Sequence, residues 1–189
     1  MTPGAFQGRY RLLFLTLVVL GLWIGAWATG VTSRFTSESI RSLLAGRGLW
    51  GVVAFTILFS AGQLLRVPSV VFVAAAVAAY GRNSGTLVAL LGALVSANVS
   101  FALIRALAGQ ALADIQRPLI RRLLTNINTR PVLTVALLRL IFQTAPPLNY
   151  ALPMTAVRWR DHLVGSVLGL PMPVIVMSFF FSRLFHRSV

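Results

Sequence analysis

Three arginines lie inside or beside apolar stretches, at positions where a charged side chain is costly. Arg66 and Arg139 each precede a proline by a few positions, and Arg105 directly follows a long uncharged run. Ionisable residues within membrane segments usually face the protein interior or water and mark a ligand pathway. A guanidinium binds phosphate through parallel N–H groups. These three arginines are therefore candidate phosphate-binding residues.

Each arginine also has a purely structural interpretation. Arg66 and Arg105 would extend their charged ends to the membrane interface while their stems lie in apolar surroundings. Arg139 fits this interpretation less well, because it lies beside the strongest proline break of the chain.

Three uncharged polar residues complete the candidate binding set. Asn98 lies seven positions before Arg105, which is about two helical turns, so both side chains share one helix face. Asn149 and Tyr150 follow a pair of prolines. They would either line a cavity together with Arg139 or bond to backbone groups that the prolines leave free, and the sequence leaves both roles open.

Chemistry beyond binding has little support in the sequence. The chain has no cysteine, which excludes thiolate metal sites and disulfides. His162, His186, Glu38, Asp114 and Asp161 are dispersed and do not form a convincing metal site. His162 is interpreted as an interfacial residue. We therefore expect no enzymatic activity, no cofactor and no metal.

The composition is that of an integral membrane protein. Of 189 residues, 57% are hydrophobic and 11% are charged, whereas soluble domains average roughly 25% charged residues. All 17 basic residues are arginine, and the net charge is +14. Because the arginines are scattered between apolar segments, we expect membrane lipids with anionic headgroups as partners rather than nucleic acid. The sequence leaves open whether the protein forms a homo-oligomer.

The first 47 residues are expected to form two elements outside the main domain. Residues 12–33 carry no charge and are long enough to span a membrane. A signal peptide is the alternative, but this apolar run is too long for one. Residues 34–47 are expected to form an amphipathic helix on the membrane surface, with an apolar face of Ile40, Leu43 and Leu44.

The first half of the main domain, residues 48–185, combines spans with one short arm. Residues 48–65 are just long enough to cross, but 66–82 enclose only 15 uncharged residues, which is too short for an ordinary span. We interpret 66–82 as a re-entrant hairpin arm that Pro68 begins and Gly81 closes. Residues 83–104 form a full span, with small residues that allow close helix packing at Gly85, Ala89, Gly92, Ser96 and Ser100.

The second half, beyond a basic surface helix at 106–128, repeats this plan. A second hairpin is expected near 131–157, broken by Pro146, Pro147 and Pro153. A last span at 162–182 should kink at its two prolines. Lipid offers no hydrogen bonds, so broken segments must be buried in protein or line a wet cavity. Broken segments in corresponding positions of two halves indicate a transporter-type site between repeats.

The motifs of this domain resemble those of the DedA / VTT-domain (SNARE-associated Golgi protein) family. The first half matches at Gly81-x-x-x-Gly85, Gly92-Ala93 and Arg105. The second half matches at Arg139-Leu140, Pro146-Pro147-Leu148-Asn149-Tyr150-Ala151, Thr155-x-Val157, Arg160-Asp161, Gly165 and Gly169. The resemblance covers roughly residues 50–185.

The resemblance implies two re-entrant hairpins that face each other across a bacterial cytoplasmic membrane in an inverted-repeat-like arrangement. It also implies movement of undecaprenyl phosphate or a phospholipid between leaflets. The chain departs from the family where Gln63 and Ala97 stand at positions that are acidic in better-known members. Pro153 stands where glycine is frequent. The resemblance therefore does not imply that this chain couples transport to protons through carboxylates.

The sequence as a whole predicts an all-α integral membrane protein with several transmembrane helices and two hairpins. The function expected is a lipid transporter or scramblase. The alternatives are a non-transporting membrane scaffold or assembly factor, and a small-solute or ion-coupled carrier. Arginines occur in nearly every loop, so the distribution of positive charge does not orient the N-terminus.

Overall fold

The computed structural model describes residues 37–44, 48–109 and 129–186, together with the isolated positions 17, 21 and 24. The expected span at 12–33 and most of the expected basic helix at 106–128 lie outside these ranges. Within them the chain is helical and contains no strand. The elements are α3 (Ser37–Leu44), α4 (Gly48–Leu64), α5 (Ser69–Tyr80), α6 (Arg82–Ala108), α8 (Pro131–Phe142), α9 (Pro146–Ala151), the 3-10 turn η1 (Leu152–Met154), α10 (Trp159–Gly169) and α11 (Pro171–His186).

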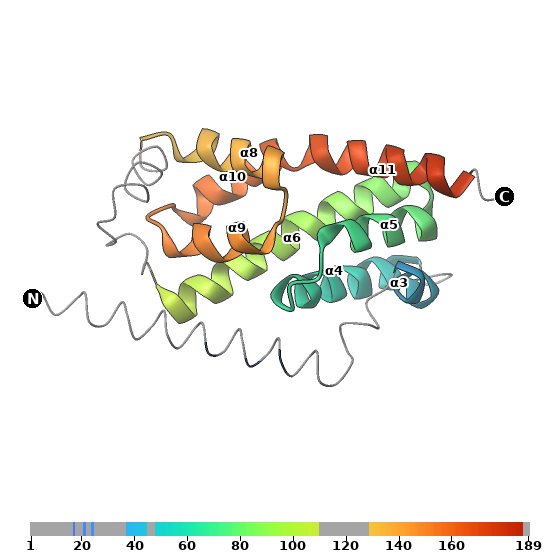
Figure 1. Ribbon diagram of the computed structural model, residues 1–189, viewed down its shortest axis with the longest axis horizontal. Helices are drawn as coiled ribbons and strands as arrows, with labels where there is room; N and C mark the ends of the chain where they lie inside the picture. Colours follow the sequence, from blue (N-terminus) through green and yellow to red (C-terminus); the bar gives the residue numbers. More distant parts are fainter. Residues whose placement is uncertain are drawn as a thin grey trace, which may run out of the picture.

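Helix α6 is the central element, and it runs diagonally through the molecule in Figure 1. Both α4 and α5 pack against it. A Cβ atom added at Gly85 would lie 2.7 Å from the Cα of Val77 on α5, and one added at Gly92 would lie 3.0 Å from the ring of Phe59 on α4. The prediction that small residues on 83–104 allow close packing is confirmed.

Helices α8 and α10 form the second closely packed pair. A Cβ atom at Gly165 would lie 2.7 Å from the Cβ of Val135, and one at Gly169 would lie 2.7 Å from the Cβ of Arg139. The two backbones approach this closely because glycine has no side chain to separate them. Glycine on α10 therefore fixes the position of the C-terminal turn of α8.

The short helix α3 packs against protein through its apolar face. Ile40 and Leu44 are only 2% and 0% exposed, and they join a core with Phe55, Phe59 and Phe72. These two residues therefore face protein rather than lipid, and the position of the helix on the membrane surface stays a prediction. The periodicity that predicts an amphipathic helix does not distinguish lipid from neighbouring helices as the apolar partner.

Two helix breaks occur where the prolines predict them, after α4 and after α8. Arg66 and Gln143 occupy these breaks with φ angles of 63° and 50°, which non-glycine residues rarely adopt. Pro68 then immediately precedes α5, and Pro146 is the first residue of α9. In both breaks, a residue with a left-handed backbone follows one helix, and a proline stands at the start of the next helix.

The remaining special positions also follow the sequence. Gly81 separates α5 from α6 with a φ of 77°, which suits a residue without a Cβ. Pro153 is buried inside η1. The expected kink in the last span lies at Leu170, between α10 and α11 and just before Pro171.

Large apolar side chains are exposed along several helices, which indicates an apolar environment around the protein. Within the described ranges, two stretches are long and apolar enough to cross a membrane, Arg82–Ala108 and Trp159–Phe185. Exposed apolar residues on these stretches include Leu87, Leu91, Val95, Val99, Met172, Ile175, Val176 and Phe180. A soluble protein rarely exposes so large an apolar area, so the fold favours a membrane protein.

Candidate functional site

Arg139 is the centre of a buried polar network. It lies in the last turn of α8, and its side chain is 0% exposed. Its Nη1 donates to the backbone oxygen of Gln143 at 2.9 Å and to Oδ1 of Asn149 at 2.6 Å. Its Nη2 lies 2.9 Å from Nε2 of His162. The break after α8 supplies Gln143, α9 supplies Asn149, and α10 supplies His162.

Asn149 connects this network to the other helix break. Its Nδ2 donates to the backbone oxygen of Thr144 at 3.0 Å and to Oε1 of Gln63 in the last turn of α4. Asn149 and Gln63 are 3% and 2% exposed. The amide of Asn149 therefore links Arg139 to α4 without placing a charge between them.

The charge of Arg139 is not balanced by a carboxylate. All three of its acceptors are neutral groups, and no ion pair is found for it in the described ranges. Nε–H has no acceptor in this part of the chain. A guanidinium has five N–H donors, and the three contacts of Nη1 and Nη2 leave a second donor, on Nη2, over. A buried unpaired charge is strongly unfavourable, which makes this position a candidate anion-binding site.

Further donors around the network also have no partner. Nε2 of Gln63, Oγ1 of Thr144 and Oγ of Ser166 are buried and make no hydrogen bond in the described part of the protein. Buried polar groups are otherwise nearly always satisfied. An excess of buried donors is the arrangement that an anionic oxygen or ordered water would complete.

His162 is the residue that the sequence analysis missed. It was expected at the interface, but it is 1% exposed, bonds to Arg139 and stacks on Phe101 with ring centroids 4.4 Å apart. A signal for its burial is present in the sequence. Gly165, Ser166 and Gly169 follow at helical spacing, and these small residues mark the packed face of α10.

Arg105 and Asn98 lie on α6 and do not join the network of Arg139. Nη2 of Arg105 donates to the backbone oxygens of Thr155 at 3.0 Å and Val157 at 2.6 Å. Nδ2 of Asn98 donates to the oxygen of Leu94 on its own helix at 2.7 Å. Arg105 thus holds the segment that follows η1, and Asn98 bonds within α6.

Tyr150 and Arg66 lie at the first helix break. The hydroxyl of Tyr150 donates to the backbone oxygen of Leu64, the last residue of α4, at 2.8 Å. The sequence left two roles open for Tyr150, lining a cavity or bonding to backbone groups. The structure shows a bond to a backbone oxygen, but that oxygen belongs to α4 rather than to the segment broken by the prolines. Arg66 is exposed and has no part in the buried network.

Gln143 ties the second break to two other helices. Its Oε1 accepts from the hydroxyl of Ser69 at the start of α5 at 3.4 Å, and its Nε2 lies 3.3 Å from the sulfur of Met177 on α11. Together with the bonds of Asn149 and Tyr150, these contacts hold the two helix breaks against each other. Pro146 and Pro147 form the first two residues of α9.

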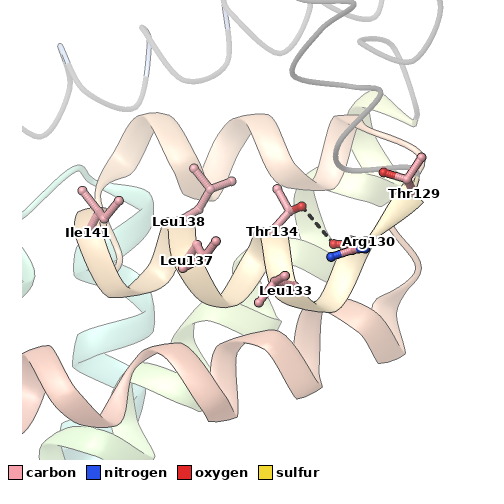
Figure 2. Close-up of a pocket in the computed structure, with 7 residues that line it drawn as sticks. All are labelled: Thr129, Arg130, Leu133, Thr134, Leu137, Leu138 and Ile141. Atoms are coloured by element: carbon pink, nitrogen blue, oxygen red, sulfur yellow. Dashed lines mark hydrogen bonds between the residues drawn. The ribbon is translucent and has the colours of Figure 1, made fainter.

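The surface groove in Figure 2 is separate from this network. It has a volume of about 340 Å³ and is lined by Thr129, Arg130, Leu133, Thr134, Leu137, Leu138 and Ile141. None of these residues contacts Arg139 through a hydrogen bond. No group of three metal-ligating side chains occurs in the described ranges either. The candidate site is therefore the buried network around Arg139.

Comparison with known proteins identifies the family. Neither the curated proteins nor the solved structures contain a match to the chain. The family model of the VTT domain matches residues 67–183, which is more than half of the chain and includes both Pro68 and the whole network contributed by α8, α9 and α10. The chain therefore belongs to the VTT-domain family, which is the DedA / SNARE-associated Golgi protein family.

Proposed function

We propose that this VTT-domain protein moves a phosphate-bearing lipid between membrane leaflets and holds the phosphate at Arg139. The cargo would be undecaprenyl phosphate or a phospholipid. The observation that carries the proposal is the complete burial of a guanidinium that has only neutral partners. A lipid phosphate would supply the missing negative charge and accept the free N–H groups.

The surroundings of Arg139 suit an amphiphilic cargo. The headgroup would enter the polar network, and its tail would stay against the exposed apolar surfaces of the spanning helices. Charged side chains inside membrane proteins commonly mark such pathways.

The helix breaks support a transporter-like architecture. In the proposal, the re-entrant segments are α5, within 66–82, and α8–α9, within 131–157, and their helix breaks meet inside a bacterial cytoplasmic membrane. Three hydrogen bonds between the breaks support this arrangement: those from Asn149 to Gln63, from Tyr150 to Leu64 and from Ser69 to Gln143. Irregular backbone at membrane depth is tolerated where it is buried in protein in this way.

The proposed activity is transport without a chemical step. The chain has no cysteine, and the residues around Arg139 offer binding groups rather than a nucleophile paired with a base. Such a pair, or a metal cluster, is what hydrolysis of a lipid phosphate would need.

Leaflet exchange in liposomes tests the proposal. The purified chain would be reconstituted with labelled polyprenyl phosphate or labelled phospholipid, and empty liposomes serve as the control. Exchange of either phosphate lipid above the control rate is expected. Absence of exchange of both lipids by folded protein would contradict transport and favour the scaffold alternative.

A further inference from the structure

We propose that His162 is a second anion-binding residue, which takes up one proton when a phosphate dianion enters at Arg139. This inference rests on the proposed function, because it needs an anion at Arg139. It adds a residue that the sequence motifs do not mark and that the sequence alone places at the interface.

The hydrogen bond between the two residues fixes the protonation of the imidazole. A guanidinium has only donors, so Nε2 of His162 must accept from Nη2 of Arg139 and carry no proton. The imidazole is then neutral and has its proton on Nδ1. That Nδ1–H is buried and has no partner in the described part of the chain.

Charge balance determines what happens when an anion arrives. Arg139 supplies one positive charge, which matches a phosphodiester. A phosphomonoester carries about −1.5 to −2 at neutral pH, so Arg139 alone leaves it unbalanced in a fully buried site. A proton from solvent on Nε2 of His162 would supply the second positive charge and would break its bond to Nη2 of Arg139. Nε2–H and the released Nη2–H could then both donate to the phosphate.

No carboxylate of the packed helices competes for this role. The charged groups near His162 are Arg139 on α8 and Arg105 on α6. On α10 itself, Arg160 and Asp161 directly precede it in sequence. Helix α11, which also packs against α10, carries its charged or titratable residues, Arg183 and His186, near its far end. The two charges that act on its imidazole are both positive, so an arriving anion is the group that favours the imidazolium.

Nitrogen NMR of the full chain in lipid nanodiscs tests the inference directly. The protein has only two histidines, so a chain labelled with ¹⁵N-histidine gives two sets of ring signals, and His186→Gln assigns them. The ligands are a short-chain polyprenyl phosphate, which is a monoester, and a phosphatidylglycerol, which is a diester. His162 is expected to be the neutral Nδ1–H tautomer without ligand and imidazolium with the monoester.

Calorimetry in buffers of different ionisation enthalpy counts the protons taken up. Monoester binding at neutral pH should take up close to one proton, and diester binding close to none. His162→Gln keeps an acceptor for Arg139 but cannot be protonated. It should abolish the proton uptake and weaken monoester binding about tenfold, with a smaller effect on the diester. His162→Phe, which keeps only the packing on Phe101, should lose affinity for both ligands.

The outcomes separate this inference from the proposed function. Monoester binding that depends on Arg139 but leaves His162 neutral would overturn the inference alone. Unchanged proton uptake in His162→Gln would also overturn it, since the proton would then reside on the phosphate. Failure of both phosphates to bind, or binding that ignores Arg139→Gln, would overturn the inference together with the proposed function.

Discussion

Asn149 and Gln63 lie 86 positions apart and are joined side chain to side chain, so that one hydrogen bond links the two helix breaks of the protein. The same Asn149 accepts from Arg139 at 2.6 Å. The buried arginine is thus held by a residue that is itself held by the opposite half of the domain. The position of the charge depends on both breaks.

Replacing Asn149 by alanine should destabilise the fold. Arg139 would lose one acceptor, and Oε1 of Gln63 would lose its donor, at a cost of about 2 kcal/mol in the free energy of unfolding. Unfolding in detergent micelles measures this loss. Asn98→Ala is the matched control, because within the described part of the chain Asn98 bonds to its own helix alone, and its loss should cost less than about 1 kcal/mol. Equal stability of the two variants would contradict the bridging role of Asn149.

Replacing Tyr150 by phenylalanine should lower stability by removing the bond to the oxygen of Leu64. The expected loss is about 1 kcal/mol, since a buried acceptor is left unsatisfied. Tyr80→Phe provides the comparison, because the hydroxyl of Tyr80 is buried and has no partner among the described residues, so its removal should be neutral or stabilising. Thermal unfolding of both variants distinguishes them, and a larger loss in Tyr80→Phe would refute this assignment.

Arg105 should act on the segment after η1 rather than on the cargo. Arg105→Gln removes a donor shared by the oxygens of Thr155 and Val157, which should free the chain at the exposed Arg158. Tryptic cleavage after Arg158 is expected to accelerate about tenfold, because local opening governs proteolysis. Cleavage after the exposed Arg82 is the internal control, and mass spectrometry measures it in the same digest. An unchanged ratio of the two cleavage rates would show that this contact holds nothing in place.

The sequence predicts the helix breaks and the packing of α6 because these depend on local chemistry. Proline removes a donor wherever it occurs, so Pro68 and Pro146 cannot continue the preceding helix, and each stands at the start of the next one. The close packing of α6 also depends on local chemistry, because its small residues let a neighbouring helix approach. The anomalous position of Arg139 was also visible, since a charge beside a proline break in an apolar run is rare.

The partners of these residues could not be predicted, because they come from distant parts of the chain. The contact between His162 and Arg139 depends on how α10 lies against α8, and Gly165 and Gly169 only show that some helix packs there. For Arg66, proximity to Pro68 suggested the interior, but the left-handed turn exposes its side chain. For α3, periodicity left the identity of the apolar partner undetermined.

Substituting Gly169 by alanine should separate α8 from α10. The added Cβ would lie 2.7 Å from the Cβ of Arg139, and such overpacking typically costs about 1 to 3 kcal/mol. Leu168→Ala on the same helix, where the side chain is 65% exposed, serves as the control for a change that leaves the interface intact. Unfolding in detergent should rank Gly169→Ala as clearly the less stable variant. The reverse order would mean that the two helices do not pack through this glycine.

The most direct test of the account compares Arg139→Gln with Arg130→Gln in the leaflet-exchange assay. Both changes remove one arginine charge from α8 or its N-terminal cap, but Arg139 is fully buried and Arg130 is exposed. Exchange of the phosphate lipid should fall at least about tenfold in Arg139→Gln, since charge-assisted bonds to phosphate are lost, and stay within about twofold of native in Arg130→Gln. Native exchange by folded Arg139→Gln would contradict the claim that Arg139 holds the phosphate.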